Sequence, residues 1–386
     1  MRNEFVFCLP TRIEFGNGSI DQTGSIAKEL GAKKVIVITD KGLSRTEILE
    51  RLRHSLSEAK IEVVLYDDVR ANPRDTEAQR AADFARSEQV DAVIACGGGS
   101  SMDLAKAVAA LLTNEGEIRS IMKPNEVPNK PAPLICVPTT AGTGSEVTSF
   151  AVLTIEEESR KSSIFDDKIR PDVAIEDPSV LQHLPPPVAA STGMDALTHA
   201  IEAYTCKLAT PLTDGLALQA IRYIAESLPE FIHVRSEESC RKMMAGSLMA
   251  GIAFGFSDIA GVHCMAEALG GMYDTPHGVA NAIFLPIVFE YNMETDLKRH
   301  RDVAVALGIS PVGKRDEEIA AEAVIWMRSI SREMKIPTLQ ELGYVSVQKF
   351  DELAELCMKN VSLSSNCREL GKTDFIDLYK RAYNLG

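Results

Sequence analysis

Residues 92–103 read AVIACGGGSSMD and carry the clearest structural signal in the chain. The apolar run Ala92–Cys96 has the composition of a buried strand, and three glycines follow it directly. The next segment, Leu104–Leu112, is apolar and predicts a helix, which Ser100 or Ser101 could cap. A strand, a tight turn and a helix in this order predict a strand–helix–strand unit with a parallel sheet.

The rest of the first half repeats this alternation. Further apolar runs predict buried strands at Lys34–Thr39, Ile61–Tyr66 and Leu134–Val137, and amphipathic segments predict helices at Thr46–Ala59 and Thr76–Glu88. We therefore expect a doubly wound, Rossmann-like α/β domain. Residues 4–15 instead alternate apolar and polar residues, which predicts an antiparallel hairpin or edge pair outside that sheet.

The second half differs in character. Three consecutive prolines at residues 185–187 form a stiff break. Almost everything after them has a helical pattern, beginning with Val188–Tyr204, Asp214–Ser227 and Glu238–Phe254. We therefore expect an α/β domain over residues 1–186 and an all-helical domain over residues 187–386.

Composition narrows the possible functions. The 386 residues are 45% hydrophobic and 25% charged, which is typical of a soluble globular protein of two domains. A net charge of −14 argues against nucleic acid and anionic membranes as partners. The eight cysteines include no CxxC pair, and neither a secretory leader nor an apolar run of about 20 residues is evident. The expected location is the cytoplasm.

Two loops of small residues predict a phosphate-bearing ligand. Gly97, Gly98, Gly99 and Ser100 lie between a strand and a helix, where backbone N–H groups and the helix dipole favour phosphate. A second loop, PTTAGTGSE at residues 138–146, also follows a strand, although the usual GxGxxG fingerprint is absent. Asp40 ends the first strand of the sheet, where a carboxylate could bind a ribose and favour NAD over NADP, or could equally be a helix N-cap before Lys41 and Gly42.

Four residues of the second half predict a metal site. Asp195 and His199 lie one helical turn apart and so share a helix face. His263 and His277 add two imidazoles beside small residues, and one carboxylate with three imidazoles completes a set of ligands for a transition metal. The alternative is structural, with Asp195 as a helix cap and the histidines as packing residues.

Taken together, these segments resemble the iron-containing (group III) alcohol dehydrogenase family. The matching segments are GGGS at residues 97–100, TTAGTGSE at 139–146, GMDALTHAIEAY at 193–204 and GGMYDTPHGVANA at 270–282, with weaker matches at residues 9–12 and 15–16. The resemblance implies the dehydroquinate synthase-like fold, with a dinucleotide domain, a helical domain and a metal in the cleft between them. It also implies a dimer formed through the N-terminal strand region, or a larger homo-oligomer.

The resemblance assigns roles to individual residues. Asp195, His199, His263 and His277 match the metal ligands; Gly97, Gly98, Gly99 and Ser100 match the pyrophosphate loop; Thr139, Thr140, Ser145 and Asp40 match cofactor contacts. The implied metal is Fe²⁺, with Zn²⁺ as the alternative. We expect His263, His277 and Glu267 to form the catalytic group, although many members have histidine where this chain has Glu267. Residues 253–258 and 365–368 also depart from the family pattern.

The implied reaction is hydride transfer between a small primary alcohol or diol and NAD⁺, giving the aldehyde. Two alternatives remain open. One is a polyol or charged-aldehyde dehydrogenase related to glycerol dehydrogenase or dehydroquinate synthase. The other is a catalytically silent NAD-binding module. Activity on an aldehyde panel separates the first from the main hypothesis, and metal analysis with NADH absorbance separates the second.

Overall fold

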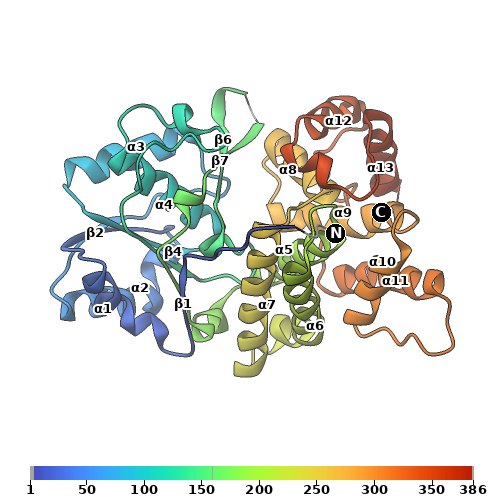
Figure 1. The fold of residues 1–386 in the computed structure, drawn as a ribbon, viewed down its shortest axis with the longest axis horizontal. Helices are drawn as coiled ribbons and strands as arrows, with labels where there is room; N and C mark the ends of the chain where they lie inside the picture. The colour runs from blue at the N-terminus through green and yellow to red at the C-terminus, as the bar shows by residue number, and fades with distance from the viewer. Residues whose placement is uncertain (1–3, 159, 385–386) are drawn as a thin grey trace. The chain divides into compact units, whose positions relative to one another are not determined.

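The computed structural model describes residues 4–158 and 160–384, and these fall into two compact units. The α/β unit comprises residues 8–140 and 144–184 (Figure 1). The helical unit comprises residues 185–384 together with the short segments 4–7 and 141–143. The parallel sheet and the helical second half that the sequence predicts are both confirmed.

The α/β unit is built on a parallel sheet. Its six strands run in the order β1 (Arg12–Phe15), β8 (Val173–Glu176), β5 (Leu134–Pro138), β4 (Ala92–Gly97), β2 (Lys34–Ile38) and β3 (Glu62–Tyr66). The four strands predicted from apolar runs are all present, with bounds within one residue of the prediction. Their side chains are buried along β4 and β5 because helices cover both faces of a parallel sheet.

The prediction for the N-terminal segment was wrong. Strand β1 pairs in parallel with β8, from Arg12 opposite Val173 to Phe15 opposite Glu176, and so forms an edge of the main sheet. An edge strand is half exposed, so its alternating pattern looks like that of a hairpin when its distant partner is unknown. The true antiparallel pair is β6 (Phe150–Ile155) with β7 (Arg160–Phe165), which the sequence analysis did not predict.

The helices of this unit define where a ligand can bind. Helices α1 (Thr23–Glu29) and α2 (Glu47–Glu58) lie on one side of the sheet, and α3 (Asp75–Ser87) and α4 (Gly99–Thr113) lie on the other (Figure 1). In the sheet, β3 lies on one side of β2, whereas β4 and then β5 lie on its other side. The carboxyl ends of β2 and β4 therefore flank the switch point, where open α/β sheets bind ligands.

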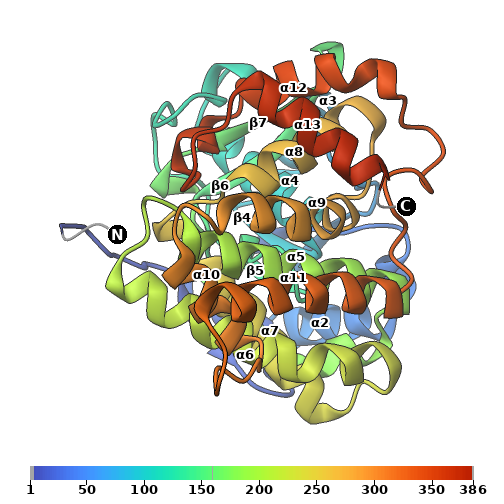
Figure 2. The ribbon, with the colours of Figure 1, turned by 90° about the vertical axis from the view of Figure 1, so that its right-hand side faces the viewer.

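The helical unit is arranged around α5 (Pro186–Thr205). The prolines at residues 185–187 lie where the helical unit begins. Pro185 is the N-cap of α5, and Pro186 and Pro187 form its first turn, where their missing N–H groups cost nothing. Figure 2 faces this unit and shows α5 and α9 at its centre. The other helices are α6 (Pro211–His233), α7 (Glu237–Phe256), α8 (Gly261–Tyr273), α9 (His277–Asn292), α10 (Leu297–Ala306), α11 (Asp316–Glu333), α12 (Phe350–Met358) and α13 (Lys372–Asn384).

Two further observations concern the expectations drawn from composition. All eight cysteines lie within the described residues and are free thiols. Across residues 4–158 and 160–384, no single helix is long and apolar enough to cross a membrane; α7 and α8 meet the length and composition criteria only as a pair bent by 99°.

A buried carboxyl pair makes the stability of the α/β unit depend on pH. Glu146 and Glu176 are 3% and 1% exposed and are hydrogen-bonded to each other. Burial raises the pKa of Glu146 to about 7, and burial with the neighbouring Glu146 raises that of Glu176 well above its usual value. The folded state therefore holds protons that the unfolded chain releases above about pH 4.5. This contribution to stability is complete below that pH and is lost as pH rises through the folded-state pKa values.

Replacing Glu176 with Gln should weaken this pH dependence, because the amide cannot ionise. Between about pH 5 and pH 9 the melting temperature of the wild-type chain should fall further than that of Glu176→Gln, by roughly 2–4 °C for each 1 kcal/mol of pH-dependent stability. Scanning calorimetry across that range measures the difference. Parallel pH profiles for the two proteins would contradict the shared-proton interpretation.

Candidate active site

The proposed metal ligands begin on α5. Asp195 and His199 are separated by one turn and are 2% and 5% exposed, so both point into the helical unit and not into solvent. Asp195 lies in the middle of the helix and is therefore not the helix cap of the structural alternative. Gly193, two residues earlier, has no room for a Cβ, which would lie 2.3 Å from Leu228 Cδ1. Any larger residue at this position would therefore have to displace the Leu228 side chain of α6.

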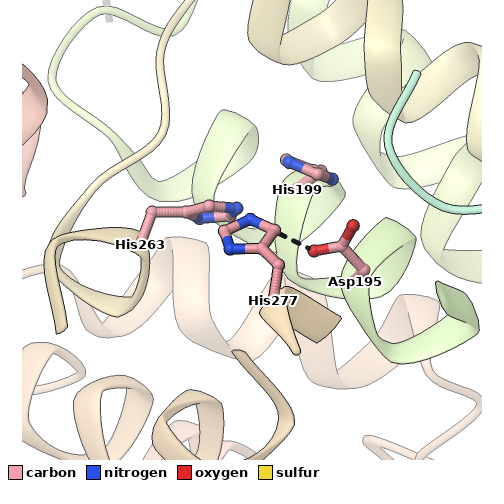
Figure 3. Close-up of side chains that lie close together, drawn as sticks. All are labelled: Asp195, His199, His263 and His277. Atoms are coloured by element: carbon pink, nitrogen blue, oxygen red, sulfur yellow. Dashed lines mark ion pairs between the residues drawn. The ribbon is translucent and has the colours of Figure 1, made fainter. Parts of the chain in front are cut away.

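The other two ligands come from α8 and α9. His263 is in the first turn of α8 and is 1% exposed, while His277 is the first residue of α9. Figure 3 shows the three imidazoles and the carboxylate of Asp195 directed toward one another. One ligand atom from each of these residues lies within 4.8 Å of all the others, and His277 Nε2 is 3.6 Å from the Asp195 carboxylate. The structure thus brings together all four predicted ligands.

The chemistry of this cluster suits a divalent transition metal. Burial lowers the pKa of His199 to about 4, opposed by the charge of Asp195, so this imidazole is neutral at neutral pH. His199 Nδ1 lies 3.3 Å from the carbonyl oxygen of Gly142, and its ring stacks on Phe254 at 4.3 Å. Neutral imidazoles with one carboxylate are donors that both Fe²⁺ and Zn²⁺ accept. The four residues therefore fit a metal, and the packing alternative does not account for their convergence.

Two buried residues around the cluster were missed by sequence analysis. Glu202 follows Asp195 by seven residues and contacts His263 Nδ1 at 2.6 Å. Asn281 follows His277 by one turn, and its Nδ2 is 2.6 Å from Asp195 Oδ1 and within 3.2 Å of Nε2 of both His263 and His277. Asn281 Oδ1 is buried without a hydrogen-bond partner among the described residues. Helical spacing from a ligand was the available signal, since both residues lie on the faces that carry ligands.

Glu267, predicted to be catalytic, lies outside this cluster of four. It follows His263 by one turn of α8 and accepts a hydrogen bond from Asn360 Nδ2 at 2.7 Å. Cys264, the residue after His263, is a buried thiol whose pKa is raised well above its usual value by burial, and it is likewise not a member of the cluster. Glu267 thus remains a candidate through its position on the helix.

Within the α/β unit, the loop at Gly97–Ser100 lies beside the start of the second predicted cofactor loop, residues 138–140. Strands β4 and β5 pair up to Gly97 opposite Pro138, and Thr139 N–H donates to the Gly97 carbonyl oxygen at 3.0 Å. A Cβ on Gly98 would lie 3.3 Å from Thr140, so the loops are in close contact. Helix α4 starts at Gly99, earlier than predicted, and Gly98 is its N-cap; neither Ser100 nor Ser101 caps it. Its first N–H groups are thus available to an anion.

The remaining cofactor candidates differ in their surroundings. Thr140 Oγ1 is buried and has no hydrogen-bond partner among the described residues. Ser145, by contrast, donates to Asp103 Oδ1 at 2.7 Å and accepts from the buried Lys106 Nζ at 2.8 Å. Asp40 Oδ1 accepts from the N–H groups of Gly42 and Leu43 at 2.8 and 3.0 Å, although the N-cap residue of the short helix that follows, Leu43–Arg45, is Gly42 and not Asp40. The cofactor roles of Asp40 and Ser145 stay predictions.

Sequence comparison gives a consistent result over both units. Residues 10–178 match the iron-containing alcohol dehydrogenase family, and residues 189–383 match the C-terminal domain of the Fe-containing alcohol dehydrogenase family. The chain is 37% identical to the 1,3-propanediol dehydrogenase of Citrobacter freundii, over 98% of this chain and 99% of that protein. It is 34% identical to the NAD-dependent methanol dehydrogenase of Bacillus methanolicus, over 97% and 99%.

Structural comparison agrees. A crystal structure of a 1,3-propanediol oxidoreductase matches with a TM-score of 0.95 and 37% identity, over 98% of this chain and 100% of that one. The matches extend through both the α/β unit and the helical unit, and the residues of the cluster fall within the matched segments. The chain therefore belongs to the iron-containing alcohol dehydrogenase family, whose members interconvert alcohols and aldehydes.

Proposed function

We propose that this chain is an NAD(H)-linked dehydrogenase that holds a divalent metal through Asp195, His199, His263 and His277. The convergence of these four side chains within 4.8 Å is the observation that carries the proposal. Fe²⁺ is the proposed ion because the family is iron-containing, and Zn²⁺ is the alternative because the donors accept it equally well. A metal bound here supplies a Lewis acid that polarises the oxygen of the alcohol or aldehyde.

The residues of the chain do the rest. Asp195 provides the one negative charge among the ligands, and Asn281 donates to its Oδ1, which fixes how the carboxylate is turned. Gly97–Ser100 and Thr139–Thr140 provide backbone and hydroxyl groups for the pyrophosphate of NAD, and the uncapped start of α4 adds N–H donors. Asp40, at the end of β2, selects NAD by repelling a 2′-phosphate. NAD held by these residues would supply the group that accepts or donates the hydride.

The proposed substrates are small primary alcohols or diols and their aldehydes. Two relatives are named for 1,3-propanediol and methanol, which supports this size and class. NADH consumption with ethanal, propanal, 3-hydroxypropanal, glyceraldehyde and a charged aldehyde tests the assignment on metal-loaded protein. Preference for the short neutral aldehydes supports it. Preference for the charged aldehyde favours the alternative of a polyol or charged-aldehyde dehydrogenase. No reaction with any aldehyde by fully metal-loaded protein favours the alternative of a catalytically silent NAD-binding module.

Glu267 is proposed to relay a proton or to orient a ligand, because it lies one turn after His263 on α8. Glu267→Gln keeps a group that can interact with Asn360 but cannot ionise. We expect a loss of turnover of about 10²-fold, typical for a proton-transfer group, with a changed pH–rate profile. Steady-state kinetics from about pH 6 to pH 10 measure both. Unchanged turnover and pH dependence would remove Glu267 from the mechanism.

The assembly and location of the enzyme are also proposals. Strand β1 is an edge of the sheet, and Phe5 and Val6 before it are 40% and 89% exposed, which supports self-association through this region. Light scattering on the purified chain tests the expected dimer or larger homo-oligomer. A cytoplasmic location is supported by the eight free thiols.

A further inference from the structure

Glu202 is a buried carboxylate that connects two of the ligand-bearing helices. It lies on α5, on the face that carries Asp195 and His199, and its side chain is 4% exposed. It is not a member of the cluster of four. Its two oxygens instead face the beginning of α8, where His263 lies.

Helix α8 depends on this carboxylate for its N-terminal cap. Its N-cap residue is Ala260, which has no side-chain acceptor, and no local side chain caps the helix. Glu202 Oε2 accepts from Ala260 N–H at 2.8 Å, and Oε1 accepts from Val262 N–H at 2.7 Å. Gly261 N–H between them donates to Asn366 Oδ1 at 3.2 Å. Residues remote in sequence thus supply the acceptors that a local cap usually provides.

The same carboxylate also determines which nitrogen of His263 carries a proton. Glu202 Oε2 lies 2.6 Å from His263 Nδ1. When Glu202 is ionised its oxygens only accept hydrogen bonds, so Nδ1 is then the protonated nitrogen and Nε2 keeps its lone pair. Nε2 is the atom on the cluster side, since it lies 3.1 Å from the Asn281 nitrogen that also contacts Asp195.

We propose that Glu202 is a positioning residue that both caps α8 and holds His263 in the Nδ1–H tautomer, with Nε2 presented to the metal. This inference rests on the proposed metal site, because only there does the choice of tautomer matter for function. A carboxylate behind a ligating imidazole orients the ring and increases its basicity.

Glutamine cannot replace Glu202 without a conflict. The two oxygens accept from backbone N–H groups, including those of Ala260 and Val262, and Oε2 also faces His263 Nδ1, so an amide NH₂ in place of either oxygen would face a donor. In place of Oε1 it opposes Val262 N–H. If the NH₂ group takes the place of Oε2, it faces Ala260 N–H and donates to His263 Nδ1. The imidazole proton then moves to Nε2, which can no longer bind the metal.

The tautomer can be measured without metal or activity. Long-range ¹H–¹⁵N spectra of metal-free protein at about pH 8 report the protonated nitrogen of each of the seven histidines, and His263→Gln assigns the signal. We expect Nδ1–H in the wild-type chain and a changed tautomer or an averaged signal in Glu202→Gln. An Nε2–H signal for wild-type His263 overturns the proposal, whether or not the variant folds.

Metal affinity provides the second readout. Competition with a chelator should show binding of Co²⁺ about 10- to 100-fold weaker in Glu202→Gln. Asp177→Asn is the matched control: Asp177 is also fully buried and accepts from the backbone of Gly18 and Ile20, and its other partners are Ser179 and Arg51. It should lower stability and leave both readouts unchanged. Normal Co²⁺ affinity in Glu202→Gln contradicts the proposal for Glu202. If the wild-type chain shows the expected His263 tautomer but binds no metal, only the proposed function is contradicted.

Discussion

Asp195→Ala should leave the enzyme without its metal and reduce alcohol oxidation about a thousandfold or more. The substitution removes the one anionic donor of the cluster and leaves three neutral imidazoles, which bind a divalent cation far less well. A Lewis acid contributes several kcal/mol to stabilising the transition state, and each 1.4 kcal/mol is a factor of ten in rate. Metal content by atomic emission, together with steady-state kcat, measures both effects.

Asp214→Ala is the control for this prediction. Asp214 lies on α6 in the same unit, and its carboxylate accepts a hydrogen bond from Arg299 Nη1 at 3.0 Å. The substitution therefore removes a carboxylate and breaks an ion pair, as Asp195→Ala removes a carboxylate, but it removes no proposed metal ligand. We expect lower thermal stability with normal metal content. Full metal occupancy and normal turnover in Asp195→Ala would show that this carboxylate is not a ligand.

Gly98→Val should weaken NADH binding about a hundredfold and leave the metal content unchanged. The Cβ would lie 3.3 Å from Thr140, and the two methyl groups would extend into the loop that precedes α4. A pyrophosphate could then no longer approach the first N–H groups of the helix, and a hundredfold loss corresponds to about 2.7 kcal/mol of binding free energy. Titration of NADH fluorescence measures the dissociation constant.

Thr140→Val separates loss of a cofactor contact from damage to the fold. Valine keeps the shape of threonine, and Thr140 Oγ1 has no partner among the described residues, so the α/β unit should be as stable as before or slightly more so. We expect NADH binding to weaken by up to about tenfold, the value of one hydrogen bond. Wild-type dissociation constants in both Gly98→Val and Thr140→Val would place the cofactor elsewhere.

The central strands were predictable because their burial is a local signal. A strand covered on both faces has to be apolar at nearly every position, and β2, β4 and β5 are. Strand β1 was misassigned because its partner, β8, lies about 160 residues away, and a half-exposed strand carries no sign of which neighbour it has. The start of α4 was placed too late because Gly98 serves as its N-cap without a side chain.

The clustering of the four candidate metal ligands was predictable because a metal site requires particular residue types, and for Asp195 and His199 also a particular spacing. Asp195 and His199 share a helix face by their separation alone, and His263 and His277 were joined to them because one carboxylate and three imidazoles make a set of metal ligands. The resemblance to a family then matched the same four residues. Glu202 and Asn281 were missed because a buried carboxylate or amide on a helix has many structural uses. Only the contact with His263 Nδ1 and the contact with Asp195 Oδ1 show what these two residues do.

The most direct test is a crystal structure of the iron-loaded enzyme with anomalous diffraction recorded at the iron edge. We expect one strong anomalous peak, bonded to the Asp195 carboxylate and to one nitrogen each of His199, His263 and His277. A peak at any other place, or no peak in protein shown to contain iron, would contradict the assignment of these four side chains as the metal site.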